Sequence, residues 1–153
     1  MKAKSPGLCL LIGAVLLSTT LGGCLGCGGE NTIRMDLTTN ADHPVSLGIY
    51  LLSKESALDG KPNADLTNRE VARTFTAADG VVDYDVRAIY PDKPFSPFIR
   101  TKPDPAITHV LIVANIAKPD PCTRRKFAVE PGKDLELRIA VADNCLKVLE
   151  SDD

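Results

Sequence analysis

The chain has 153 residues, of which 44% are hydrophobic and 25% are charged. Its 18 Lys and Arg stand against 20 Asp and Glu, which gives a net charge of −2. A chain with this balance lacks the excess of cations that binding to nucleic-acid phosphates requires, so we expect no nucleic-acid partner.

The N-terminus has the pattern of a bacterial export signal. Two lysines precede an apolar run over residues 8–17, and Leu21-Gly22-Gly23-Cys24 follows the run. The run is too short and too interrupted to span a bilayer. Small residues directly before a cysteine suit a lipoprotein signal peptidase, so we predict a signal peptide over residues 1–23. The mature protein would begin at Cys24 and carry lipid on that side chain.

Two alternatives remain open at this point. An ordinary secretory signal cut elsewhere would leave Cys24 unmodified, and Cys27 is a competing lipidation site. Residues 24–32 are rich in glycine and predict a flexible tether, which leaves a domain over residues 33–150. Leu25 follows the predicted lipidated cysteine, where bacterial lipoproteins retained at the inner membrane usually have aspartate. Its presence favours the outer membrane, by resemblance to those proteins.

The chain after the tether begins with two predicted strands. Residues 33–38 alternate between apolar and polar side chains, and residues 45–52 place Val, Leu, Ile and Leu on one face. Asn, Asp and Pro in the segment 40–44 predict a turn between them, so we expect an antiparallel sheet. Residues 53–73 break the pattern, and we expect short helices over 53–58 and 66–72 outside the sheets.

A third strand is predicted over residues 81–90. Asp83 and Asp85 share one face of it, as an acid and base pair would require, but no apolar residues surround them to raise a pKa. We therefore favour a solvated face that Arg87 neutralises.

Five prolines follow over residues 91–105, a pattern that excludes a central strand. This segment is either a binding loop that offers Phe95 and Phe98 to a ligand or a crossover whose phenylalanines fill the core. The second interpretation is favoured, since aromatic loop residues in small sandwiches often cap the core.

The remaining elements complete an all-β pattern. Residues 107–117 are continuously apolar and predict a strand buried on both faces. His109 lies at its start without a second ligand or base spaced to join it, so we interpret it as a structural histidine. Residues 127–129 and 135–141 flank Glu130-Pro131-Gly132-Lys133, which predicts a hairpin, and a last short strand follows over 146–149. The alternation and turn spacing predict a two-sheet sandwich.

Two cysteines flank the predicted hairpin. In an oxidising compartment we expect a disulfide between Cys122 and Cys145, which leaves Cys27 as a spare thiol or a rival partner. No two of these three cysteines have the short spacing of a zinc site, so no metal is expected. The chain also lacks the motifs of familiar catalytic sites, and we expect neither enzymatic activity nor a cofactor.

The order of elements resembles the type VI secretion lipoprotein family, known as TssJ, SciN or VasD. That family has a strand of the form PVVVRxYQL after an LNxD loop, and six residues here fit it: Pro44, Val45, Leu47, Ile49, Tyr50 and Leu52. Ala64-Asp65-Leu66 resembles the family's acidic and aromatic helical element, and residues 110–114 resemble its central strand. The chain departs from the family at four places: Gly48 replaces Arg, Leu51 replaces Gln, Leu66 replaces an aromatic residue, and Cys122-Thr123-Arg124 replaces Trp-Arg.

The resemblance implies a mainly β fold, namely a transthyretin-like, two-sheet antiparallel β-sandwich with a small helical excursion. It also implies a lipid-anchored protein on the periplasmic face of the outer membrane that binds the periplasmic domain of TssM, an inner-membrane protein. The action would be structural, and the contacts would come from the first loop, which is short here: Asn40, Ala41, Asp42 and His43. A rival prediction is a generic envelope lipoprotein that binds its partner through the proline-rich loop 91–105.

Overall fold

Strands dominate the part of the chain that the structure describes. The computed structural model describes residues 31–93, 96–116, 122–142 and 145–150. The predicted signal peptide over 1–23, the predicted lipidation site Cys24, Cys27 and nearly all of the tether lie outside the described residues, as does Phe95. No helix among the described residues is long and apolar enough to cross a membrane.

The strands and helices have the following bounds. The strands are β1 (Thr32–Thr39), β2 (Val45–Leu52), β3 (Val81–Ile89), β4 (Ser96–Thr101), β5 (His109–Ala114), β6 (Arg124–Ala128), β7 (Leu135–Ala142) and β8 (Cys145–Glu150). The helices are α1 (Asn63–Leu66), α2 (Arg69–Ala72) and a 3-10 turn, η1 (Ala77–Asp79).

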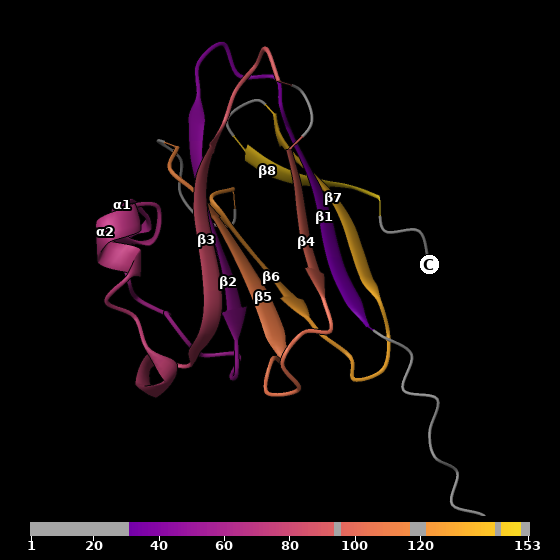
Figure 1. Cartoon of the computed structure of the whole chain (residues 1–153). Coiled ribbons are helices and arrows are strands. Elements are labelled where there is room, and N and C mark those ends of the chain that lie inside the picture. The colour runs from indigo at the N-terminus through magenta and orange to yellow at the C-terminus, as the bar shows by residue number, and fades with distance from the viewer. Residues whose placement is uncertain (1–30, 94–95, 117–121, 143–144, 151–153) are drawn as a thin grey trace, which may run out of the picture.

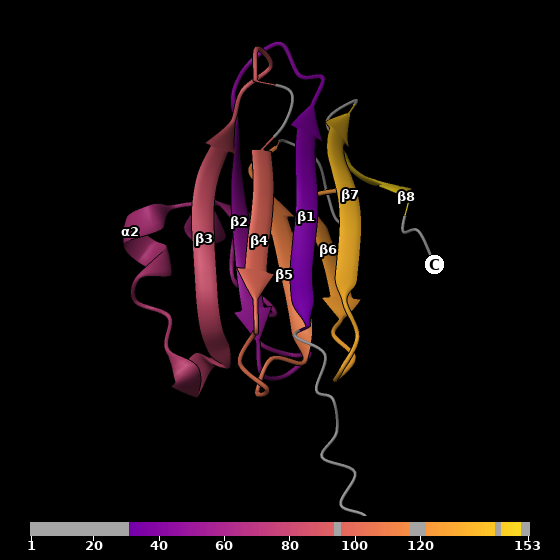
Figure 2. The ribbon, with the colours of Figure 1, turned by 45° about the vertical axis from the view of Figure 1, so that its right-hand side comes forward.

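The strands form two four-stranded sheets that face each other (Figure 1, Figure 2). One sheet has the order β4-β1-β7-β8 and the other β3-β2-β5-β6. The predicted two-sheet, mainly β sandwich is therefore confirmed. Every pairing between neighbouring strands is antiparallel except that of β1 with β7, which is parallel. The prediction of a wholly antiparallel sandwich is wrong at this pair.

Two predicted neighbours lie in different sheets. The strands β1 and β2, expected to pair, belong to opposite sheets, and so do β6 and β7, expected to form a hairpin. The turn at 130–133 is present, since Lys133 N–H donates to the Glu130 carbonyl and Gly132 has a φ of 80°. Strands that enclose a core from its two sides show the same alternation as strands of one sheet, so the alternation does not identify the partner.

The inter-sheet core is built from the inward faces of both sheets. Side chains with at most 1% of their surface exposed include Met35 and Leu37 from β1, Leu47 and Ile49 from β2, and Ile112 from β5. Strand β5 is buried on both faces, as predicted: alternate residues face the inter-sheet core, while Leu111 and Val113 belong to a second apolar cluster. The central strands of this sheet, β2 and β5, are thus covered on both sides.

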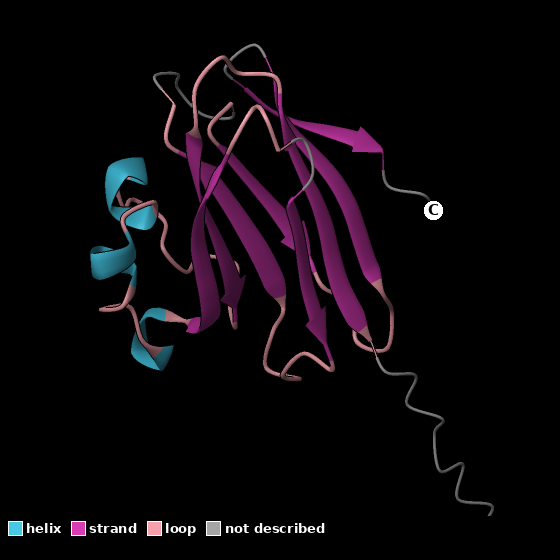
Figure 3. Ribbon diagram, turned by 45° about the horizontal axis from the view of Figure 1, so that its top comes forward, coloured by secondary structure: helices cyan, strands magenta, loops and turns pink. Residues whose placement is uncertain are grey.

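The second apolar cluster lies under the helices, which cover only the outer face of the β2-containing sheet (Figure 3). Leu58 and Leu66 are buried there, as expected, and Val71 is half-buried. The helix expected over 53–58 is wrong: the segment forms turns, and Leu58 has a φ of 63°, which a continuing α-helix excludes. The helix expected over 66–72 is split between α1 and α2, because Asn68 caps α2 by accepting from the N–H groups of Glu70 and Val71.

The helices dock onto β2 through a close approach at Gly48. The Tyr50 hydroxyl donates a hydrogen bond of 2.7 Å to the Leu66 carbonyl, and the tyrosine is fully buried. A Cβ at Gly48 would lie 2.2 Å from the same carbonyl oxygen. No side chain fits at this position, because α1 lies directly against it. The position of α1 therefore explains why residue 48 is glycine where the resembled family has arginine.

Candidate functional site

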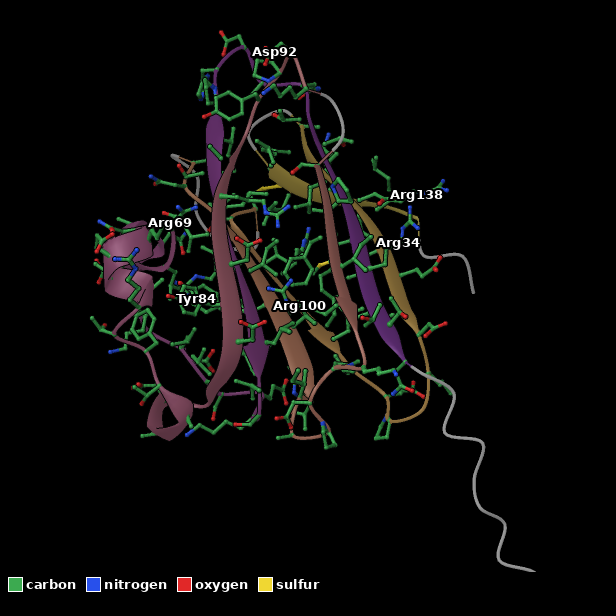
Figure 4. All side chains as sticks on the ribbon, viewed as in Figure 1. Arg34, Arg69, Tyr84, Asp92, Arg100 and Arg138 are labelled. Carbon is green, nitrogen blue, oxygen red and sulfur yellow. A yellow bond between two sulfur atoms is a disulfide. The ribbon has the colours of Figure 1, made fainter. Side chains whose placement is uncertain are left out.

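The carboxylates predicted on β3 lie between the sheets. Asp83 accepts from Arg100 Nε at 2.7 Å, and Asp85 accepts from Arg87 Nε at 2.8 Å. Arg100 is labelled in Figure 4. Arg87 also donates to the Pro97 carbonyl at 2.9 Å. Arg87 neutralises Asp85, as expected, but the face is only partly exposed to solvent, because the free edges of β3 and β4 approach each other here. The Asp85–Arg87 pair lies within β3, and the Asp83–Arg100 pair forms a bridge between the sheets.

Phe98 fills the core beneath this bridge. Its side chain is 1% exposed, and the guanidinium carbons of Arg100 and Arg87 lie 4.7 Å and 5.8 Å from its ring centre. The favoured interpretation, in which this phenylalanine fills the core, is confirmed. Residues 96–101 form an edge strand, β4, in which Pro97 is tolerated. The interpretation of 91–105 as a binding loop is wrong for this strand and for Phe98.

The opposite side of the sandwich is closed by the predicted disulfide. Cys122 precedes β6 and Cys145 begins β8, so the bond between them joins the two sheets. Leu146 N–H donates to the Cys122 carbonyl at 2.7 Å, and Arg125 Nε donates to the Leu146 carbonyl at 3.3 Å. Both open sides of the sandwich are therefore closed by specific contacts. These residues stabilise the fold by joining the two sheets along both sides.

The concave surfaces along the free edge of β3 contain no assembled chemical site. Two adjoining hollows of about 630 and 380 Å³ share Asp83 and Tyr84 in their walls. Asp83 is engaged by Arg100, and Arg69 donates to the Val86 carbonyl at 2.9 Å. His109 lies 3.0 Å from the Thr108 hydroxyl, and within the described residues no three His, Cys, Asp or Glu side chains are grouped to hold a metal.

The predicted partner-binding loop is ordered by contacts with the sandwich. Asn40 N–H donates to the Val141 carbonyl at 3.1 Å, and Ala41 N–H donates to the Thr39 hydroxyl at 3.0 Å. Ala41 also packs against the inter-sheet core. The first two residues of the loop are therefore held against the sandwich, and the next two project from it.

Asp42 and His43 form the exposed tip of this loop. Their side chains are 96% and 62% exposed, and His43 Nδ1 lies 2.6 Å from Asp42 Oδ1. The hydrogen bond from His43, followed by one from the backbone, lowers the pKa of the Asp42 carboxyl. The acidic group of the tip is therefore the Asp42 carboxylate, with His43 beside it.

The loop and the start of β1 lie at opposite ends of the sandwich. The chain enters the fold at Thr32 and reaches the loop after the eight residues of β1. A strand of that length spans about 25 Å. Figure 1 shows residues 40–44 at the top of the molecule and the beginning of β1 at the bottom. Any segment that precedes Thr32 therefore joins the domain about one strand length from the loop.

The structure brings only some of the predicted residues together. Asn40, Ala41, Asp42 and His43 lie together at one end, whereas the β3 carboxylates and the disulfide lie on the two sides of the sandwich. Sequence reasoning assigned Tyr90 to the end of a strand and did not consider it as a site residue. Its signal was the Pro91-Asp92-Lys93 turn, which places an aromatic residue directly beyond β3.

The fold defines a class of small two-sheet sandwiches with a helical patch on one outer face. No protein-family model matches the chain, and no curated protein matches its sequence. Solved structures of type VI secretion lipoproteins match its fold, a two-sheet sandwich of this class.

Two of the matching structures are lipoproteins or membrane-bound proteins. TssJ1, the type VI secretion lipoprotein of Pseudomonas aeruginosa, is 17% identical with a TM-score of 0.64, and the alignment covers 81% of this chain and 98% of that chain. Lip of Serratia marcescens, a membrane-bound component of the Type VI Secretion System, is 14% identical with a TM-score of 0.62. That alignment covers 79% of this chain and 98% of Lip.

A third match is a chain in a structure of the C-terminal domain (869–1107) of the type VI secretion protein TssM from EAEC. It is 16% identical with a TM-score of 0.58, over 78% of this chain and 98% of that chain. At these identities the likeness lies in the fold.

Proposed function

We propose that this chain is a lipoprotein of the periplasmic face of the outer membrane and a structural component of a type VI secretion membrane complex. It binds the periplasmic C-terminal domain of a TssM-like protein, and its role involves no catalysis. The observation that carries this proposal is the shared fold, because about four-fifths of this chain covers 98% of TssJ1 and of Lip.

The proposed contact surface is the loop formed by Asn40, Ala41, Asp42 and His43. Its support is threefold: the first two residues of the loop are hydrogen-bonded to β1 and β7, its tip is exposed, and it lies at the end of the sandwich opposite Thr32. Residues that are held in place before binding lose little conformational entropy when they bind, which favours recognition by a small number of residues.

The TssM structure supports the identity of the partner. The match covers 78% of this chain and 98% of the matched chain in a structure named for the TssM C-terminal domain. An association of this fold with TssM is what the proposed pairing requires.

The proposed anchor is lipid on Cys24, after removal of residues 1–23. The tether 24–32 would reach on the order of 15 Å. Added to the length of β1, this holds the loop within about 40 Å of the membrane surface. The partner consequently has to approach the outer membrane to be bound.

Fractionation tests the anchor. Cys24→Ser is expected to move the protein from membranes to the soluble periplasmic fraction in high salt without changing its thermal unfolding. Cys27→Ser, the matched control, is expected to remain in the membrane fraction. Retention of Cys24→Ser on membranes would refute the anchor. Release of Cys27→Ser but not of Cys24→Ser would show that Cys27 is the lipidated residue.

Binding tests the partner. The chain without its first 24 residues is immobilised, and the periplasmic C-terminal domain of the TssM-like protein from the same genome is titrated against it. Replacing Asn40–His43 by glycine and serine is expected to weaken binding at least about tenfold, since central interface residues dominate affinity. The same replacement at the exposed turn 130–133 serves as the control. Absence of binding by the unmodified domain refutes the proposed function.

A further inference from the structure

Tyr90 lies directly beside the proposed contact loop. The ladder between β2 and β3 ends with the pair Val45 and Ile89, so the next residues outward on the two strands are Pro44 and Tyr90. Residues that follow a terminal antiparallel pair stay within about 5–8 Å of each other. The tyrosine therefore belongs to the same end surface as the tip of the 40–43 loop.

The turn after β3 is ordered and presents the tyrosine ring. Lys93 N–H donates to the Tyr90 carbonyl at 3.1 Å, which closes a tight turn. The Lys93 ammonium lies 5.9 Å from the centre of the Tyr90 ring. Asp92 is exposed at the top of the molecule (Figure 4). A cation on one side of the ring limits its rotation and leaves the remainder accessible.

Tyr90 is unusual among the exposed apolar side chains of the described residues. It is 45% exposed, and the other large ones are Ile99, Val148 and Leu149, which are aliphatic and lie on edge strands. Tyrosine is enriched among residues that dominate binding energy, because it buries a large rigid surface and retains a polar hydroxyl. An exposed tyrosine at the end of the sandwich that also carries the exposed Asp42 and Asp92 is suited to protein recognition.

We infer that Tyr90 is the aromatic anchor of the partner interface and that the turn 90–93 is the second half of the contact surface. This inference rests on the proposed function. The complementary partner surface has an apolar hollow for the ring, flanked by basic side chains that face the carboxylates of Asp42 and Asp92. The 40–43 loop alone has four residues, far fewer than the roughly 20–30 per side of a typical stable interface.

The test compares two side chains of equal exposure. Tyr90→Ala is titrated with the same TssM-like domain, and Ile99→Ala is the control, because Ile99 is also 45% exposed but lies on the outer face of β4. Tyr90→Ala is expected to weaken binding at least about tenfold, and Ile99→Ala less than about twofold. Circular dichroism verifies that both variants are folded.

The outcomes separate this inference from the proposed function. Absence of binding by the unmodified domain refutes the proposed function. Binding that the 40–43 replacement weakens and that Tyr90→Ala leaves unchanged refutes the role of Tyr90 alone. Equal losses for Tyr90→Ala and Ile99→Ala also refute it, because the affinity would then not depend on this end of the sandwich.

Discussion

Replacing Gly48 with alanine tests how the helices are held on the sandwich. The added Cβ would lie 2.2 Å from the Leu66 carbonyl oxygen and 2.9 Å from the Tyr50 ring. The nearer atom belongs to the backbone, so no side-chain rotation relieves the contact, and α1 has to move outward by about 1 Å. That movement also breaks the hydrogen bond from the Tyr50 hydroxyl to the same carbonyl.

The expected loss of stability follows from these two effects. Overpacking of a well-packed site costs about 1–3 kcal/mol. A buried carbonyl left without its donor costs a further ~1–3 kcal/mol. Alanine recovers about 0.5–1 kcal/mol relative to glycine in a strand, because its unfolded state has less conformational freedom. The free energy of unfolding should therefore fall by about 1–5 kcal/mol, and the middle of this range, about 3 kcal/mol, lowers the melting temperature by roughly 10 °C in a domain of this size.

Urea denaturation of Gly48→Ala, Tyr50→Phe and the double variant measures this coupling. Tyr50→Phe removes only the hydrogen bond, and the double variant should lose less than the sum of the single losses, because both changes act on one carbonyl. Ser46→Ala, two residues earlier on the same face of β2, is the control and should change stability by less than about 0.5 kcal/mol. The docking of α1 on β2 would be refuted by a Gly48→Ala variant as stable as the unmodified protein. It would also be refuted if the double variant lost the full sum of the two single losses.

Three further predictions concern the two sides of the sandwich and the 3-10 turn. Replacing Cys122 and Cys145 with serine should lower the free energy of unfolding by about 3 kcal/mol, as expected for a sequence separation of 23, and dithiothreitol should then have no further effect on urea denaturation. Arg100→Ala should lower the free energy of unfolding by about 1–1.5 kcal/mol, because Asp83 loses its hydrogen-bond partner and the Phe98 ring loses its cation. The control is Arg73→Ala, which breaks an exposed ion pair and should lower it by less than about 0.5 kcal/mol. Equal losses for the two variants would contradict the bridge between the sheets. The Asp79 carboxyl, whose pKa is lowered by the hydrogen bond from the Thr76 backbone, should titrate in the folded protein below the value of about 3.9 seen in unfolded chains. Because the folded pKa is the lower one, ionised Asp79 stabilises the folded protein above the unfolded value of about 3.9, and this stabilisation is lost as the pH falls through the folded pKa. NMR titration checks the folded pKa, with Asp79→Asn as control.

Strand positions could be predicted from the sequence because local signals determine them. The strand predicted over 45–52 has the same bounds in the structure, since Pro44 lacks an N–H group before it and polar residues begin at Ser53. The continuous apolar run of β5 correctly indicated burial on both faces. The disulfide was also predictable, because two cysteines near the ends of neighbouring elements have few other partners in an oxidising compartment.

Strand partners could not be predicted in the same way. The turn at Pro131-Gly132 reverses the chain, but β6 pairs with β5 and β7 pairs with β1. Both outcomes satisfy the same turn and the same alternation, and only the tertiary arrangement distinguishes them. The Asp83 and Asp85 side chains were assigned to solvent for a related reason: their arginine partners include Arg100, seventeen residues away from Asp83. The alternation of β3 does not reveal that its edge faces the edge of β4.

The candidate contact surface depends on the same crossing between sheets that sequence reasoning missed. Because β1 and β2 belong to different sheets, the 40–44 segment bridges them across the end of the sandwich instead of forming a hairpin tip at one sheet. The bridge brings Asp42 and His43 over the end of the core, and the β2–β3 pairing then adds Tyr90 beside them. In the proposed interface, residues from two crossings form one surface, so the contact does not depend on the short loop alone. The shortness of the first loop is therefore compatible with partner binding, provided that the turn 90–93 takes part.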